Sequence, residues 1–494
     1  MITSIPLTIA SLLVLHLDFN TIQMKKESVV DCLRVASKAG YNAVLWELEN
    51  KVKWESCPEC VHGEAFSKTE FKEILAEADR LGLEPIPLLQ TVGHAEYVLT
   101  ASPYVSWRED RTNPACYCTS KPEVRAHLKK LVDEYLELFG PKVRHFHLGG
   151  DEALVFGTCS TCRTRNKMDL YVEHLNAVAQ VLFERGIRPG VWADMMLIAG
   201  DWNRRNEVEL DEPEIRKLPT AYTLWNWDYG TGYVSDAVCK GRRPRMFAFT
   251  GRLQELGYSV IACGASQSAL DTLFLPFYER HRCNLATCAE LARTRNLLGC
   301  CCTSWSVHLY PKKLQYPLWE FMATRYLKPT ATPESDYAAA IRRHFGDVPP
   351  QTLDRIGAGG GTFMGFDARQ RGYLKPAVPA DPGQLENCLK DAKKGGPNAV
   401  ARRVERLRGE VASLNVALDE IRGLSGKDDA TQILLTAVEL KKTFIERVAD
   451  VLEGKPLAKL PVGVTESYYR TFQSPLSAAN ATALVWSVLA QSGK

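Results

Sequence analysis

The chain contains 494 residues, of which 45% are hydrophobic and 24% are charged. These proportions are typical of a globular protein and exclude a disordered, collagen-like or low-complexity chain. The formal net charge is only +3 and no basic stripe or polybasic tail is present, so we expect neither a nucleic acid nor a membrane surface as a partner.

The first apolar run, Ile5–Leu17, does not have the pattern of an export signal. The residues before it, Met1–Ser4, carry no Lys or Arg, and Pro6 and polar residues interrupt the run. It continues into Asp18 without a small-residue cleavage site. No other stretch approaches the roughly 18 apolar residues of a membrane span. We therefore expect a cytoplasmic protein, with the second half of this run forming a buried strand.

Eight β-rich runs alternate with helical patterns or long connections in the first two thirds of the chain. The strands are predicted at Leu12–Asp18, Ala43–Glu49, Pro85–Gln90, Val143–Gly150, Arg188–Asp194, Ala221–Trp227, Ser259–Gly264 and Cys300–Ser306. Helices are predicted between them at Glu27–Ala39, Lys68–Leu81, Glu123–Phe139, Met168–Arg185, Pro244–Leu256 and Cys283–Leu297. This alternation predicts a parallel sheet, and eight such units predict a (β/α)8 barrel.

An open doubly wound sheet is the structural alternative. It would usually carry a Gly-rich phosphate-binding turn after the first strand, and Asp18–Thr21 has no glycine.

The pattern changes after about residue 330. The segment Gly357–Gly383 is rich in Gly and Pro and is expected to be a loop or linker, whereas Pro397–Leu424 and Asp428–Leu452 have helical apolar spacing. We therefore predict a (β/α)8 barrel in residues 1–330 and an α-helical C-terminal domain of two or three antiparallel helices in residues 331–494. These helices are expected either to pack on the barrel or to form a homodimer.

Acidic and aromatic residues stand at the predicted C-terminal ends of the strands, where (β/α)8 barrels carry their active sites. They are Asp18, Glu47, Glu49, His94, Asp151, Glu152, Trp192, Asp194, Trp227, Tyr229 and Trp305. Carboxylates can bind sugar hydroxyls and an indole can pack against the apolar face of a pyranose. Glycosidic cleavage also needs a carboxylic acid that protonates the leaving oxygen. The rim therefore indicates a carbohydrate as substrate.

The pair Asp151–Glu152 is the strongest candidate for this acid chemistry. Gly149 and Gly150 precede it and free the backbone to turn, so the two side chains need not point to opposite faces as in a regular strand. The alternative is an acidic pair that caps the next helix.

The segment His147–Glu152, with the sequence HLGGDE, resembles the catalytic motif of glycoside hydrolase family 20, the β-N-acetylhexosaminidases. The resemblance is strongest to the hexosaminidase D branch. The other segments that carry it follow in family order along residues 12–310: His16–Asp18, Glu47–Glu49, Gln90–His94, Trp192–Met195, Trp227–Tyr229 and Thr303–Trp305.

The resemblance implies that the barrel is the catalytic domain of an exo-acting β-N-acetylhexosaminidase. Such an enzyme hydrolyses terminal β-linked N-acetylhexosamine, GlcNAc or GalNAc, with retention and without a cofactor. The 2-acetamido oxygen of the substrate attacks the anomeric carbon, as in the family's substrate-assisted mechanism. Glu152 matches the general acid and base, and Asp151 matches the residue that orients the acetamido N–H.

The resemblance also implies the residues that bind the substrate. They are Asp18, Glu47, Glu49, His94, Trp192, Asp194, Trp227, Tyr229 and Trp305. Tyr229 is the candidate donor to the acetamido oxygen, Trp305 matches the wall against the pyranose, and Trp192 or Trp227 would line the acetamido pocket. His94 would support the acid pair.

The chain departs from the family pattern at two positions. The first strand ends in Asp18 where large members have Arg, and no acid stands two residues after Trp305. Asp18, Glu47 or Glu49 is then expected to bind the sugar hydroxyls.

Two CxxC pairs suggest a metal site. Cys57 and Cys60 follow the second predicted strand, and Cys159 and Cys162 follow the fourth. Four thiolates could bind a structural zinc ion. The pairs are about a hundred residues apart, unlike those of a compact zinc ribbon, so ordinary free thiols, or disulfides in an exported protein, are the alternative. A further run, Cys116–Cys118, follows the third strand.

Two other functions are alternatives to a hexosaminidase. A non-catalytic glycan-binding barrel would share the aromatic rim, but the intact Asp151–Glu152 pair argues against it. A metal-dependent hydrolase on the same fold would use histidines at strand ends, and His16, His94, His145 and His147 keep this hypothesis open. We rank it last because His145 lies well before the end of its strand.

Overall fold

The computed structural model describes residues 11–197, 211–229, 246–268, 271–306, 308–329, 332–358, 395–424, 428–456 and 458–492. The chain forms two compact units. The first comprises Met1–Asn20, Leu33–Ala265 and Cys283–Thr303, and the second comprises Thr21–Cys32, Ser266–Arg282 and Ser304–Lys494. The predicted boundary at residue 330 falls inside the second unit and stays a prediction.

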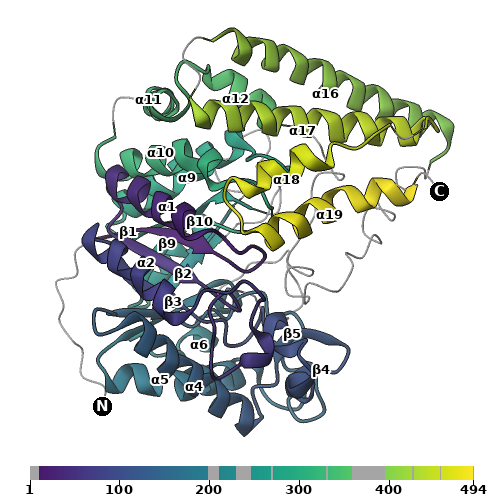
Figure 1. Cartoon of the computed structure of the whole chain (residues 1–494). Coiled ribbons are helices and arrows are strands. Elements are labelled where there is room, and N and C mark those ends of the chain that lie inside the picture. Colours follow the sequence, from purple (N-terminus) through teal and green to yellow (C-terminus); the bar gives the residue numbers. More distant parts are fainter. Residues whose placement is uncertain are drawn as a thin grey trace. The chain divides into compact units, whose positions relative to one another are not determined.

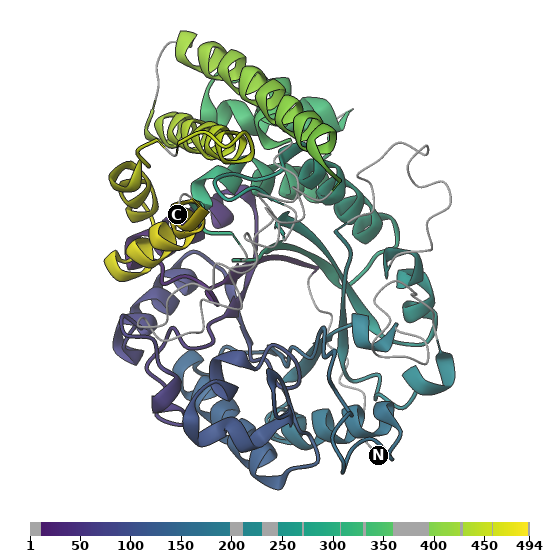
Figure 2. The same ribbon diagram turned by 90° about the vertical axis from the view of Figure 1, so that its right-hand side faces the viewer.

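A closed barrel of eight parallel strands forms the centre of the first unit (Figure 2). Around the barrel the strands follow in the order β1 (Leu12–Asp18), β10 (Gly299–Ser304), β9 (Ser259–Gln267), β8 (Thr223–Trp227), β7 (Arg188–Trp192), β6 (His145–His147), β3 (Glu84–Leu88) and β2 (Ala43–Glu47). The barrel closes because β1 pairs with β2 on one side and with β10 on the other. The predicted (β/α)8 barrel is confirmed, and the open doubly wound sheet is excluded.

Helices alternate with the strands along the chain. They are α1 (Lys26–Ala39), α2 (Lys68–Arg80), α3 (Glu96–Leu99), α4 (Pro122–Phe139), α5 (Lys167–Glu184), α6 (Glu212–Ile215), α8 (Thr250–Glu255) and α9 (Tyr278–Thr294). Helix α2 begins at a capping box, in which Ser67 accepts from the backbone of Glu70 while the Glu70 carboxylate accepts from the backbone of Ser67. The start of the predicted helix Pro244–Leu256 lies outside the described residues.

A short hairpin that the sequence pattern does not predict stands between β3 and α4. Strand β4 (Arg108–Asp110) pairs antiparallel with β5 (Asn113–Tyr117). Both strands are short, and neither carries an extended apolar alternation. The hairpin places Glu109 and Cys118 near the loop that follows β6.

In its described residues, the second unit is mainly helical from residue 316 onward. Its helices are α10 (Tyr316–Leu327), α11 (Pro333–Phe345), α12 (Pro350–Gly357), α16 (Pro397–Gly423), α17 (Asp429–Leu452), α18 (Val462–Arg470) and α19 (Pro475–Ser492). Helices α16 and α17 lie side by side (Figure 1) and match the two helices that apolar spacing predicts. The region contains more helices than the two or three expected. Most of the predicted loop Gly357–Gly383 lies outside the described residues.

None of the helices described here is both long enough and apolar enough to cross a lipid bilayer.

Closure of the barrel depends on a glycine in β10. Gly299 is the partner of Leu12 across the β1–β10 pair, and a Cβ added to it would lie 2.0 Å from the backbone oxygen of Leu12. Because this oxygen belongs to the backbone of the neighbouring strand, the two strands would have to move apart. We expect Gly299→Ala to lower the free energy of unfolding by about 2 kcal/mol, measured by chemical denaturation.

The control for this substitution is Gly409→Ala in α16. Nothing lies within 4 Å of a Cβ at this exposed helical position, so the change should raise stability by about 1 kcal/mol. A Gly299→Ala protein as stable as the parent would contradict the explanation of barrel closure.

Candidate active site

The chain turns sharply directly after β6. Gly149, Gly150 and Glu152 have φ angles of 62°, 89° and 44°, a region that glycine enters at little cost and other residues rarely enter. A Cβ on Gly150 would lie 2.4 Å from the hydroxyl oxygen of Tyr171, and this hydroxyl donates to the Gly150 carbonyl at 2.9 Å. The turn therefore requires glycine and fixes the backbone from which Asp151 and Glu152 project.

His94, in the loop after β3, lies against the acid pair. Its Nε2 is 3.2 Å from Oδ2 of Asp151 and 3.6 Å from Oε2 of Glu152. The preceding residue, Gly93, packs so closely that an added Cβ would lie 2.2 Å from the Asp151 carbonyl oxygen. The side chain of Asp151 is only 6% exposed, whereas that of Glu152 is 28% exposed. One carboxylate is thus buried and its neighbour is accessible to solvent.

Asp194, in the turn after β7, contacts the backbone of the acid pair. Its Oδ2 accepts a hydrogen bond from the backbone N–H of Glu152 at 2.9 Å, and its Oδ1 accepts from Nε1–H of Trp227 at 3.3 Å. Burial, followed by the charge of Asp151, raises the pKa of Asp194 to about 8. Asp194 is therefore mostly protonated at neutral pH, and this limits repulsion between the two buried carboxyl groups.

Glu47 connects the end of β2 to the turn after β6. Its Oε2 lies 3.0 Å from Nε2 of His16, and its Oε1 accepts from Nε2–H of Gln90 at 2.9 Å. The Gln90 carbonyl oxygen in turn accepts from the backbone N–H of Gly150 at 3.3 Å. The structure therefore links Glu47 to the acid-bearing turn through Gln90, which sequence reasoning placed in the motif but did not name as a site residue.

Two further carboxylates, Asp18 and Glu49, are buried beside Glu47. Asp18 is the partner of Glu47 across β1 and β2. Burial, followed by the charges of Glu47 and Asp18, raises the pKa of Glu49 well above its usual value. The structure thus brings together the three acids that were predicted to bind sugar hydroxyls.

Lys51 is a buried cation beside these acids that sequence reasoning missed. It is 1% exposed, and its ammonium group donates to the Asn20 carbonyl at 2.8 Å. Burial lowers its pKa to about 8, whereas the charges of Glu49 and Asp18 oppose that shift. Its sequence signal is its position four residues after the end of β2. That position indicates a role for Lys51 only when the acids at the same end of the barrel are known.

The predicted aromatic residues occupy different environments. Trp192 is fully buried, with its ring centre 4.4 Å from that of His147, so it packs within the barrel. Trp227 and Tyr229 stack with ring centres 5.1 Å apart and are half-buried. Trp305 directly follows β10, is 8% exposed and belongs to the second unit. Trp227 contacts the network around the acid pair through its hydrogen bond to Asp194.

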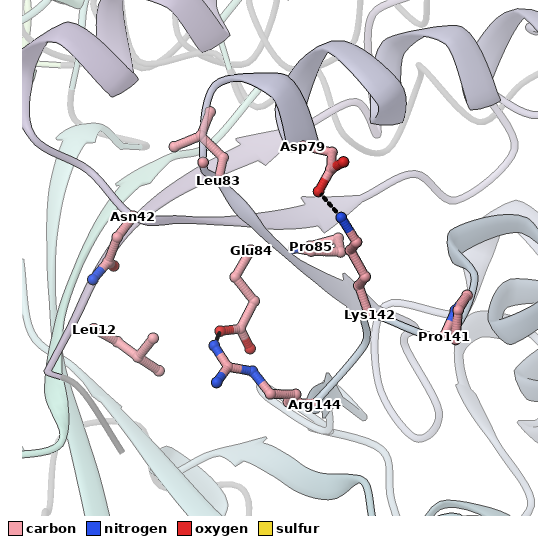
Figure 3. A pocket seen from close by; sticks show the side chains of 10 residues that line it. Leu12, Asn42, Asp79, Leu83, Glu84, Pro85, Pro141, Lys142 and Arg144 are labelled. Carbon is pink, nitrogen blue, oxygen red and sulfur yellow. Dashed lines mark hydrogen bonds and ion pairs between the residues drawn. The ribbon is translucent and has the colours of Figure 1, made fainter. Parts of the chain in front are cut away.

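A separate pocket of about 500 Å³ lies at the N-terminal ends of the first strands (Figure 3). Two ion pairs, Asp79–Lys142 and Glu84–Arg144, lie among its lining residues. Active sites of (β/α)8 barrels occupy the other end of the strands, which is where the carboxylates gather. We therefore assign this pocket no part in the candidate site.

The cysteines form a different group from the predicted one. Cys57 and Cys60 are joined to each other in a disulfide. Cys159 and Cys162 lie with Cys118 and Glu109 instead. The four-thiolate site proposed from the two CxxC pairs therefore does not match the group that the structure assembles, because the β4–β5 hairpin brings Cys118 to the second pair.

A (β/α)8 barrel with an Asp–Glu pair and further acids at the C-terminal ends of its strands defines a glycoside hydrolase-like protein. Residues 39–241 match the family profile described as glycosyl hydrolase family 20, catalytic domain. This match, and the relatives described below, agree with the resemblance to glycosyl hydrolase family 20 and to the hexosaminidase D branch that the motifs predict.

The chain is similar to two hexosaminidase D proteins. It is 30% identical to that of Bos taurus over 224 residues, which are 44% of this chain and 62% of that protein. It is 30% identical to that of Homo sapiens over 223 residues, which are 43% of this chain and 44% of that protein. The aligned part thus spans less than two thirds of either relative.

Among solved structures, a chitobiase of Flavobacterium johnsoniae shares the fold. The superposition has a TM-score of 0.53 and covers 95% of this chain and 77% of that chain, at 13% sequence identity.

Asp194 should make the stability of the protein depend on pH. Its pKa is about 8 in the folded protein, against an ordinary value of 3.8, so the folded state binds this proton more tightly than the unfolded chain. The resulting stabilisation is complete below pH 3.8 and is lost as the pH rises through 8. Asn cannot ionise in this pH range, so we expect the free energy of unfolding of Asp194→Asn to lack this decrease with rising pH.

The measurement is chemical denaturation of parent and variant at a series of pH values. The free energy of unfolding of the parent minus that of Asp194→Asn should fall between pH 4 and pH 8. A difference that stays constant over this range would show that Asp194 does not hold the additional proton.

Proposed function

We propose that the barrel is an exo-acting β-N-acetylhexosaminidase that removes terminal β-linked GlcNAc or GalNAc with retention of configuration. The observation that carries the proposal is the pair of adjacent carboxylates after β6. Asp151 is buried and Glu152 is accessible, and His94 and Asp194 hold them together. The match of residues 39–241 to the catalytic-domain profile of glycosyl hydrolase family 20, and the similarity to hexosaminidase D, support the same activity.

In the proposed first step the carbonyl oxygen of the substrate's 2-acetamido group attacks the anomeric carbon. The glycosidic bond breaks, and Glu152 gives its proton to the leaving oxygen. The product of this step is a cyclic oxazolinium ion. Glu152, now ionised, then removes a proton from a water molecule that attacks the anomeric carbon from the opposite side and reopens the ring. Two inversions give net retention.

Asp151 is suited to accept the acetamido N–H. Its Oδ1 is buried and has no hydrogen-bond partner among the residues that the structure describes, and a buried carboxylate oxygen gains strongly from a donor. A negative charge here also stabilises the positive charge that develops on the acetamido nitrogen. His94 and Asp194 are positioning residues in this scheme, since they contact the acid pair.

The remaining predicted residues complete the substrate site in this proposal. Tyr229 donates to the acetamido oxygen, and Trp192 or Trp227 lines the acetamido pocket. Asp18, Glu47 and Glu49 bind the sugar hydroxyls, while the role of Trp305 as a wall against the pyranose stays a prediction from the sequence. The acid, the base and the nucleophile all come from the chain or the substrate, so the reaction uses no metal ion. The partner is thus an N-acetylhexosamine glycoside, while the homodimer and the cytoplasmic location stay predictions from the sequence.

The histidines favour this proposal over a metal-dependent hydrolase. His16, His94 and His145 each lie beside a different carboxylate: Glu47 at 3.0 Å, Asp151 at 3.2 Å and Glu84 at 2.8 Å. Nδ1 of His147 accepts from the backbone N–H of Gly149 at 2.9 Å. Among the described residues, the one group of side chains close enough together to bind a metal ion contains no histidine. The non-catalytic glycan-binding barrel is the alternative that the next experiment addresses.

Glu152→Gln should abolish most of the activity. The amide cannot give or accept the catalytic proton, so we expect kcat for an aryl β-N-acetylglucosaminide to fall by about 10²- to 10⁴-fold. The loss should be greater with an alkyl leaving group, which needs protonation more than an aryl one. Circular dichroism of the variant checks that it is folded.

The matched control is the substrate. An aryl β-glucoside without the 2-acetamido group should be turned over far more slowly than the N-acetylglucosaminide, because it lacks the internal nucleophile. Equal rates for the two glycosides would exclude the substrate-assisted mechanism, and an inactive parent protein that still binds the sugar would favour the non-catalytic barrel.

Tyr229→Phe tests the proposed contact with the acetamido oxygen. Removal of one donor to a developing charge should lower kcat by about 10²-fold, while the stacked ring against Trp227 and the melting temperature are retained. Steady-state kinetics with the N-acetylglucosaminide measure the effect. An unchanged kcat would assign the acetamido oxygen to a different donor.

A further inference from the structure

Three cysteine sulfurs and one carboxylate converge beside the loop that carries the acid pair. Cys118 directly follows β5, Glu109 lies in β4, and Cys159 and Cys162 lie in the loop between β6 and α5. The Cys118 sulfur is 3.7 Å from that of Cys159 and 3.8 Å from that of Cys162. One ligand atom from each of the four residues lies within 4.8 Å of all the others.

The distances between the sulfurs fit a tetrahedral metal centre. Zinc binds thiolate sulfur at about 2.3 Å, so two sulfurs at corners of a tetrahedron around zinc are about 3.8 Å apart. The same distances are too long for a disulfide, which needs about 2.05 Å between the sulfurs. The two distances from the Cys118 sulfur therefore match those between ligands of a tetrahedral zinc ion.

Glu109 provides an independent reason to expect a cation here. It is 3% exposed, and its Oε1 accepts from the backbone N–H of Cys159 at 2.9 Å. Its Oε2 is buried and has no hydrogen-bond partner within the part of the chain that the structure describes. A buried carboxylate oxygen without a donor is costly, and coordination to a metal ion would remove that cost.

Hydrogen bonds to the sulfurs support the same conclusion. The backbone N–H of Cys162 donates to Sγ of Cys159 at 3.4 Å, and the Ser120 hydroxyl lies 3.1 Å from Sγ of Cys162. Donors of this kind orient the ligands of a metal and stabilise thiolates. Cys159 and Cys162, at CxxC spacing, would supply two ligands from one loop. Cys118 and Glu109 would supply the other two.

We propose that Cys118, Cys159, Cys162 and Glu109 bind a structural zinc ion. Thiolate ligands select zinc over the hard cations Mg²⁺ and Ca²⁺, and four protein ligands leave no open position, so the ion is structural and takes no part in hydrolysis. The site ties the β4–β5 hairpin to the loop that begins with Asp151–Glu152. Cys57 and Cys60 are outside it.

The test uses the purified chain of 494 residues. Elemental analysis by mass spectrometry should find about one zinc per chain, and X-ray absorption at the zinc edge should find three sulfurs at about 2.3 Å and one oxygen at about 2.0 Å. Cys118→Ser and Cys162→Ser should each lose the metal. Glu109→Gln should release zinc to a competing chelator faster than the parent does.

The matched control is the double substitution Cys57→Ser with Cys60→Ser. It removes the other CxxC pair and should leave the zinc content unchanged. Loss of zinc in this control would overturn the ligand assignment, as would a spectrum with four sulfurs or with a histidine. Absence of zinc both after purification and after incubation with zinc under reducing conditions would overturn the site itself.

Cobalt binding to the parent protein tests the same ligand set without any cysteine substitution. Co²⁺ added to the metal-free protein should give the visible bands of a tetrahedral ion and near-ultraviolet charge-transfer bands from thiolates. Added zinc should then abolish these bands. A cobalt spectrum without thiolate bands would contradict the proposal.

Discussion

The site depends on a single backbone constraint, the left-handed turn after β6. In a regular strand, adjacent side chains point to opposite faces, and Asp151 and Glu152 could not both approach His94. Positive φ angles at Gly149, Gly150 and Glu152 remove this restriction. For Glu152 such a conformation costs about 1 to 3 kcal/mol, and the hydrogen bond from its N–H to Asp194 helps to offset that cost. The strain therefore lies on the residue proposed as the acid.

The same end of the barrel concentrates acidic groups in a volume from which water is largely removed. The molecule limits the repulsion by protonation rather than by pairing every acid with a cation, since the pKa of Asp194 and that of Glu49 are both raised. Lys51 is the buried cation beside Glu49, and its own pKa is lowered. Opposite shifts of neighbouring groups are typical of sites that move protons. Glu152 is the partly exposed carboxyl of the pair, with 28% of its side chain exposed.

Sequence reasoning located the barrel and the acids because both follow from local patterns. Several of the buried strands, such as β1 and β2, are largely apolar runs, and parallel closure brings the residues after all eight strands to one end. It missed the contacts that only folding creates. Nothing in the spacing of Lys51 or Gln90 shows that they face Asp18 and Glu47. Likewise Cys118 replaces the predicted Cys57 and Cys60 as a neighbour of Cys162 because an unpredicted hairpin moves it there.

The proposed zinc site and the turn after β6 act on the same loop from its two ends. Strand β6 has only three residues, and the chain that follows it runs from Asp151 to the cysteines before α5 begins at Lys167. The hydrogen bonds of Gly150 and Glu152 fix the beginning of this segment, and metal coordination at Cys159 and Cys162 would fix its end. A mechanism in which the substrate supplies the nucleophile requires the acids to hold the acetamido group in one orientation, because misplacement by about 1 Å can cost about 10²-fold in rate. Fixing both ends of the loop meets that requirement without adding any group to the reaction itself.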